Sequence, residues 1–136
     1  MQVSIDRIGS VAKNTGIERQ SILSSEIRCR LGTVIVGRVL EDKRIYNQLE
    51  ECDGKLHRLQ KGDIIAGVIG SRRALRGHTG MLPTQLRVGD TLHLLNMGGV
   101  LGCASSSSPE VGEALPIEVL GVPLVDGLPG HIGSGA

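Results

Sequence analysis

The fold is decided by a stretch that occurs twice: Leu59-Gln60-Lys61-Gly62-Asp63-Ile64-Ile65 and, 27 residues later, Leu86-Arg87-Val88-Gly89-Asp90-Thr91-Leu92. In each copy a Gly-Asp pair stands just before a run of apolar or β-branched residues. Glycine adopts turn conformations without strain, and the aspartate can accept hydrogen bonds from nearby backbone N–H groups as an Asx turn. Each copy therefore predicts a tight turn that leads into a strand. A looser third copy, Val111-Gly112-Glu113-Ala114-Leu115, predicts the same for a later strand.

Short apolar runs surround this repeat, and no long helical pattern interrupts them. Asp53-Gly54 is a dipeptide typical of a two-residue hairpin turn, so it joins two of the runs. Many short strands separated by turn signals are typical of a small barrel or sandwich. We therefore predict an all-β fold, a closed or partly open β-barrel of about six to eight short strands. The expected strands are residues 33–40, 45–50, 55–59, 64–69, 91–96 and 115–122.

The two ends of the chain are patterned differently from this barrel domain, which we place at residues 27–124. Residues 1–26 form an N-terminal arm, in which Thr15 and Glu18 have the spacing of a capping box and predict a short helix over 17–24. An extended arm is the alternative. Residues 125–136 are expected to be a flexible tail, as if the barrel were a module of a longer chain. Ser105 to Ser108 is expected to be a surface loop.

Composition limits the function classes. The 136 residues suit one domain, and 40% of them are apolar, but the single aromatic residue is Tyr46. The core must then be built from Leu, Ile and Val. Single-stranded nucleic-acid binders usually stack bases on aromatic rings, so nucleic acid is an unlikely partner and weak RNA binding is only a second alternative. The chain has no apolar run of membrane-spanning length and no signal-peptide layout at its start, so we expect a cytoplasmic protein.

The cysteines and histidines give no pattern for a metal or a cofactor. Three cysteines, Cys29, Cys52 and Cys103, are an odd number, which favours free thiols over a disulfide framework. The chain has no Cys-x-x-Cys and no His-x-x-x-His spacing. A ligand set gathered from distant positions stays open but has no support from spacing. We predict neither a metal nor a cofactor.

A basic segment is the best candidate for a binding site. Arg72, Arg73, Arg76 and His78 lie within seven residues, bracketed by glycines, and no acidic residue lies between Asp63 and Asp90. Arginine forks and the backbone N–H groups of glycine-rich turns are suited to phosphate, sulfate or carboxylate. The competing interpretation is a solvated loop whose arginines pair with the acidic second half of the chain. That half carries three glutamates, Glu110, Glu113 and Glu118.

Catalytic patterns are weaker. Cys103 with His93 and His78 could form the site of a small hydrolase or lyase, but nothing in their spacing selects this set. Glu50 and Glu51 are adjacent, so on a strand they would point to opposite faces and could not act as a carboxylate pair. Catalysis by this chain is therefore the alternative rather than the leading hypothesis.

These observations favour a non-catalytic binding or interaction module, which could serve as an accessory domain of a larger enzyme. Its ligand would be a small anion held by the basic segment. We also expect self-association, because small β-domains often pair to cover strand edges.

Overall fold

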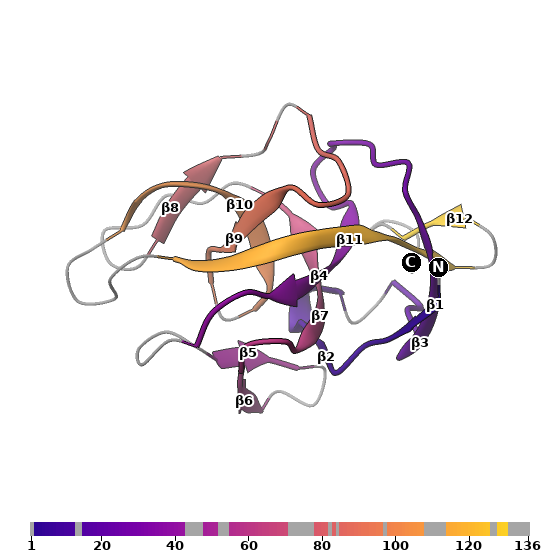
Figure 1. The fold of residues 1–136 in the computed structure, drawn as a ribbon, viewed down its shortest axis with the longest axis horizontal. Coiled ribbons are helices and arrows are strands. Elements are labelled where there is room, and N and C mark those ends of the chain that lie inside the picture. Colours follow the sequence, from indigo (N-terminus) through magenta and orange to yellow (C-terminus); the bar gives the residue numbers. More distant parts are fainter. Residues whose placement is uncertain are drawn as a thin grey trace.

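The computed structural model describes residues 2–12, 15–42, 48–51, 55–70, 78–81, 83, 85–96, 98–107, 114–125 and 128–130. Within these ranges the chain is built from strands, with one short 3-10 turn, η1 (Figure 1). The elements in chain order are β1 (Gln2–Ser4), β2 (Arg7–Ile8), η1 (Ser10–Ala12), β3 (Gln20–Ser24), β4 (Val34–Val39), β5 (Gln48–Glu50), β6 (Leu56–Arg58), β7 (Ile64–Ile69), β8 (His78–Met81), β9 (Thr91–Leu94), β10 (Val100–Ser107), β11 (Leu115–Val125) and β12 (Leu128–Pro129).

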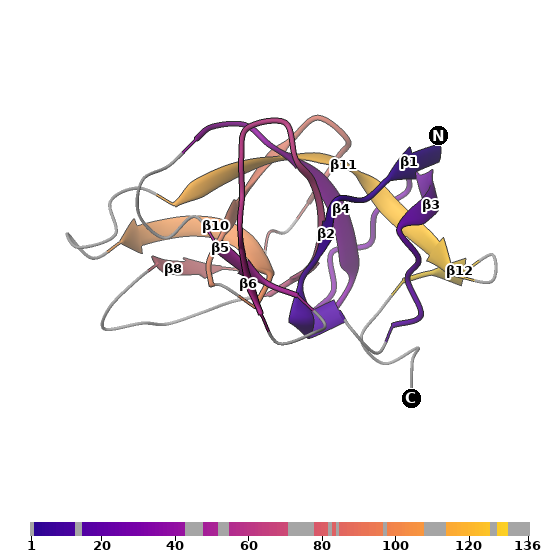
Figure 2. The same ribbon diagram turned by 90° about the horizontal axis from the view of Figure 1, so that it is seen from below.

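Five strands close into a barrel, which confirms the predicted all-β barrel class. Around the ring, β4 pairs with β7, β7 with β10, β10 with β9, β9 with β11, and β11 with β4. The pair β7–β10 is parallel and the other four are antiparallel. Outside this ring, Figures 1 and 2 show β1, β3 and β12 at one end of the molecule and β8 at the other.

The two Gly-Asp turns have the predicted form and share the same hydrogen bonds. Gly62 and Gly89 have φ of 94° and 95°, a conformation that favours glycine. The Asp63 carboxylate accepts a bond of 2.9 Å from the Gln60 N–H, and the Asp90 carboxylate accepts one of 2.9 Å from the Arg87 N–H. The likeness of the two stretches therefore extends from the residues to the backbone geometry.

Each turn is fastened to the neighbouring barrel strand in the same way. The Gly62 N–H donates to the Val39 carbonyl of β4, and the Gly89 N–H donates to the Val119 carbonyl of β11, both at 2.8 Å. In return, the Val39 N–H donates to the Asp63 carbonyl and the Val119 N–H to the Asp90 carbonyl. The strands that leave the turns, β7 and β9, then run antiparallel to β4 and β11.

This equivalence predicts equal effects of removing the two aspartates. Asp63→Ala and Asp90→Ala should each lower the free energy of unfolding by about 1 kcal/mol, because each loses one hydrogen bond at an exposed turn. Urea unfolding of both variants checks this, with Gln60→Ala as the control, since only the backbone of Gln60 contributes to the turn. A difference of more than about 1 kcal/mol between the two variants would contradict the equivalence.

The core is aliphatic, as the composition predicts, and it has two parts. The larger cluster fills the barrel, where Ile35, Ile65, Leu92 and Ile117 are fully buried. The smaller cluster lies between the barrel wall and the N-terminal arm, where Ile5 and Ile8 pack against the outer side of β4 and β7. The arm is thus part of the folded unit, because β2 also pairs with β7.

The helix predicted over residues 17–24 is wrong, and the extended alternative is correct. Residues 20–24 form β3, with alternating exposure along the strand, and pair with β1 and β11. The Thr15 hydroxyl donates back to the Ala12 carbonyl at 2.7 Å instead of capping a following turn. Pairing with two strands outweighs the local helix signal.

Two predicted irregular segments are also strand. Ser105 to Ser107 continue β10, because β8 pairs with them through Ser107; Ser108 lies outside the described residues. In the expected C-terminal tail, β12 pairs with the end of β11. The Gly130 N–H donates to the Pro123 carbonyl, and the Gly130 carbonyl accepts from the Val34 N–H at 3.0 Å. These backbone bonds hold residues 128–130 against the barrel.

A separate hairpin, β5–β6, covers one part of the barrel core (Figure 2). Leu49 on β5 and Leu59 just after β6 are fully buried in the barrel cluster. Glu51, directly after β5, forms a bridge with Gly9 of the arm. The hairpin therefore lies between the barrel and the N-terminal arm and contacts both.

Candidate anion-binding segment and a buried ionic cluster

The basic segment is attached at a two-stranded extension of the barrel. Arg72, Arg73 and Arg76 lie outside the described residues, and so does the segment that carries Glu110 and Glu113. The sheet residues on either side of the basic segment are described. Before it, the Gly70 N–H donates to the Leu101 carbonyl at 2.9 Å.

After the basic segment, the chain re-enters the sheet at His78, the first residue of β8. In the antiparallel pairing of β8 with β10, His78 is opposite Ser107, and Met81 is opposite Cys103. The segment therefore leaves and rejoins the structure at two places along β10 that are about six residues apart, or roughly 20 Å. The acidic segment starts directly after Ser107, so it begins beside the place where the basic segment ends.

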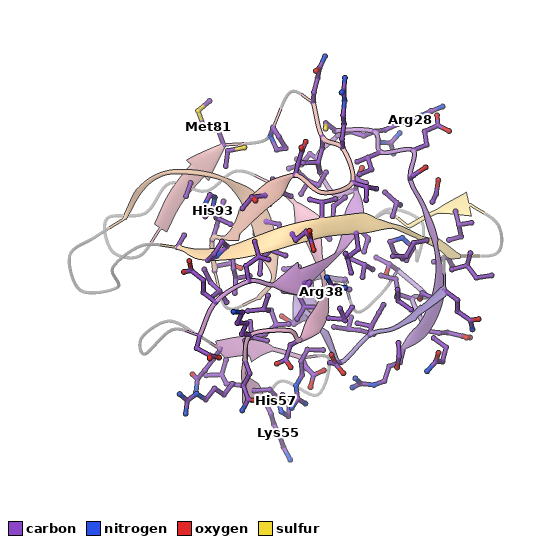
Figure 3. All side chains as sticks on the ribbon, viewed as in Figure 1. Arg28, Arg38, Lys55, His57, Met81 and His93 are labelled. Carbon is purple, nitrogen blue, oxygen red and sulfur yellow. The ribbon has the colours of Figure 1, made fainter. Side chains whose placement is uncertain are left out.

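One proposed acidic partner of the arginines is engaged elsewhere. Glu118 lies on β11 opposite Arg38 of β4, and the Arg38 guanidinium donates to its carboxylate at 3.2 Å. This cross-strand pair lies on the barrel wall, where Figure 3 labels Arg38. Of the three glutamates considered for the basic segment, Glu118 therefore has a different cationic partner.

The residues of the catalytic alternative lie on three strands, β8, β9 and β10. His93 on β9 is opposite Gly102 of β10, so the neighbouring Cys103 belongs to the other face of the sheet. The His93 ring is placed beside β10, where its Nδ1 accepts a long bond of 3.5 Å from the Ala104 N–H. His78 enters the pairing three residues along β8 from the position opposite Cys103. Cys103, His93 and His78 thus belong to three different strands, and the side chain of His78 lies outside the described residues.

The other described thiol is Cys29, on the edge of the barrel core. Burial raises the pKa of the Cys29 thiol, and Cys103 and Asp90 add to the effect. A raised pKa keeps a thiol in its less nucleophilic protonated form. Cys29 contacts the barrel core with one side and behaves as a small apolar residue there.

In the described ranges, no three or more His, Cys, Asp and Glu side chains gather in a way that could hold a metal ion. Nor does that part of the chain contain a helix with the length and hydrophobicity to cross a membrane.

A site that the sequence did not reveal lies where the β5–β6 hairpin meets the N-terminal arm. Glu51 is only 6% exposed, yet its carboxylate is surrounded by donors. Oε2 lies 3.2 Å from Nη1 of Arg7 and 3.1 Å from Nε2 of His57. Oε1 accepts bonds of 3.3 Å from Nη2 of Arg19 and 3.2 Å from the Ile8 N–H. We call these four groups, the three N–H donors and the His57 ring, the Glu51 cradle.

The cradle is built from distant parts of the chain. Arg7 and Ile8 belong to β2, Arg19 precedes β3, and His57 is the central residue of β6. Arg19 is fixed further by donating to the carbonyls of Ile5 and Asp6. A buried carboxylate needs such donors, because an ionised group without partners is costly away from water.

Comparison with known proteins gives no family for this chain. No family model matches it. No curated protein and no solved structure matches it significantly either. The fold and the residues of the two candidate sites are therefore the basis for any functional proposal.

Proposed function

We propose that this protein is a non-catalytic binding module that holds a small anionic ligand through Arg72, Arg73, Arg76 and His78. The ligand class is an oxyanion such as phosphate, sulfate or a carboxylate, which arginine forks and glycine-rich backbone recognise. The observation that carries the proposal is the attachment of the segment. Its two ends meet the sheet at Gly70 and His78, both in backbone contact with β10.

Two further observations support binding rather than catalysis. The barrel interior is filled by aliphatic side chains, which offer no polar group for chemistry. Cys103 and His93 belong to opposite faces of their sheet, an arrangement that favours binding over a nucleophile and base pair. Cytoplasmic location and self-association, which we expect from the sequence, are compatible with such a module and remain predictions.

The proposal predicts a specific stabilisation by phosphate. At equal ionic strength, phosphate should raise the Tm of the wild type more than chloride does, because a ligand that binds only the native state stabilises it. The free energy of unfolding rises by about 2.7 kcal/mol when the ligand concentration is a hundred times its Kd. The variant Arg72→Ala/Arg73→Ala/Arg76→Ala should lose this extra response. Thermal melts of both proteins in the two salts measure it.

The matched control is Arg28→Ala/Arg30→Ala/Arg87→Ala, which removes three arginines that are exposed in the structure. It should keep the extra phosphate response, because the basic segment is unchanged. General exclusion of the anion from the surface does not depend on single sites, so by that mechanism alone both variants would keep the response. If the basic-segment variant keeps the full response, or unfolds outright, the proposal is wrong. Binding that falls steeply with salt and needs RNA would instead favour the RNA alternative.

A further inference from the structure

We propose that the Glu51 cradle is a second, separate site, one that binds a carboxylate and is occupied at rest by the chain's own Glu51. Three N–H donors from two chain segments hydrogen-bond one carboxylate, and Nε2 of His57 lies 3.1 Å from its Oε2. This is the arrangement that recognises a planar carboxylate from outside, with arginine N–H groups and a backbone N–H as donors. The external ligand is therefore a carboxylate.

The charges of the cradle favour binding of a further anion besides the Glu51 carboxylate. The cradle holds two arginines against one carboxylate, so it has a surplus positive charge. The donors are also reachable, because the side chain of Arg19 is 57% exposed and that of Arg7 is 35% exposed, whereas that of Glu51 is 8% exposed. A ligand could approach from the arginine side without entering the barrel.

The element that carries Glu51 is separate from the barrel ring. The hairpin β5–β6 forms its own two-stranded sheet, outside the barrel ring. Leu49 and Leu59 attach it to the barrel core, and Glu51 attaches it to the arm. Figure 3 places His57 and Lys55 at the lower edge of the molecule, away from β8 and Met81. An external carboxylate that replaces Glu51 would release the arm side of the hairpin.

The first test is rescue of a variant in which the resting ligand is removed. Glu51→Ala should lower the Tm, and acetate should restore roughly half of the lost Tm in a saturable way, compared with chloride at equal ionic strength. Glu50→Ala is the matched control, because Glu50 is the adjacent carboxylate and takes no part in the cradle; it should show no acetate-specific response. Adding Arg7→Ala and Arg19→Ala to Glu51→Ala should abolish the rescue.

The second test uses the unaltered chain and stays informative if Glu51→Ala does not fold. Hydrogen exchange of the amides of Leu56 to Arg58 should become about threefold faster in acetate than in chloride, while the amides of β7 stay unchanged. The tripeptide Gly-Glu-Gly amide, compared with acetate, tells an acidic protein side chain from a small free acid as the source. The proposal is overturned if a folded Glu51→Ala shows no rescue, or if acetate leaves the hairpin amides of the wild type unchanged.

Discussion

Gly67→Ala should lower the free energy of unfolding by about 3 kcal/mol, one of the largest effects that we expect for a single residue outside the aliphatic core. Gly67 lies in the middle of β7, where the turn between β9 and β10 crosses it. A Cβ at this position would lie 2.3 Å from the Gly99 carbonyl oxygen, and the side chain of Leu101 is 3.1 Å away. The Val68 N–H donates to that same oxygen, so the clash is with backbone that is held in place.

Gly98→Ala is the matched control, because it adds the same methyl group to the crossing turn. There the nearest atoms are side-chain atoms of Val11, Asn96 and Ser10, at 3.3 to 3.5 Å, which can shift. Its cost should stay below about 1 kcal/mol. Urea unfolding with a common m-value measures both variants. Equal stability of Gly67→Ala and Gly98→Ala would show that β7 and the turn are not packed as the structure has them.

The barrel strands were predictable because their residues satisfy two requirements at once. The run 64–69 is β-branched and apolar, and it follows a Gly-Asp turn, so local propensity and turn chemistry agree. The structure places β7 over the same six residues. The strand predicted over 115–122 begins at the same residue as β11, but β11 is longer by three residues, which pair with β3 and β12.

The segments outside the barrel were less predictable, because distant partners decide their structure. Residues 20–24 carry a nearby helix-start signal, yet they become β3 when β1 and β11 pair with both of its edges. The serines at 105–107 have the composition of a loop, but β8 supplies a backbone partner for them. Pairing over long distances along the chain leaves no local trace in such residues.

The Glu51 cradle shows the same limit for the candidate sites. Alternation along the strand does indicate that Glu51 shares the buried face of Leu49. Glu50, between them, is only half-buried, which fits the prediction that the two carboxylates point to opposite faces. The donors, however, come from residues more than 30 positions away, Arg7 and Arg19, and nothing in the sequence links them to Glu51. The basic segment, in contrast, was visible because its arginines are neighbours in the chain.

Leu59→Ala and Leu86→Ala should each lower the free energy of unfolding by about 3 kcal/mol. Both leucines stand three residues before the glycine of a Gly-Asp turn, and both insert into the barrel core, with 2% and 8% exposure. Truncating either side chain removes its apolar contacts and leaves a cavity that the barrel strands cannot close. Equivalent positions in the two stretches should therefore give similar losses, measured by urea unfolding.

Val88→Ala is the control for these two variants, because it shortens an apolar side chain of the second turn that is 47% exposed. The free energy of unfolding should change by no more than about 0.5 kcal/mol, since the Val88 side chain is already largely exposed and its truncation removes few buried contacts. Leu59 also joins the β5–β6 hairpin to the barrel, so Leu59→Ala should additionally speed hydrogen exchange in β6 at low urea, whereas Leu86→Ala should not. A loss below about 1 kcal/mol for either leucine variant would mean that its turn does not anchor the barrel core.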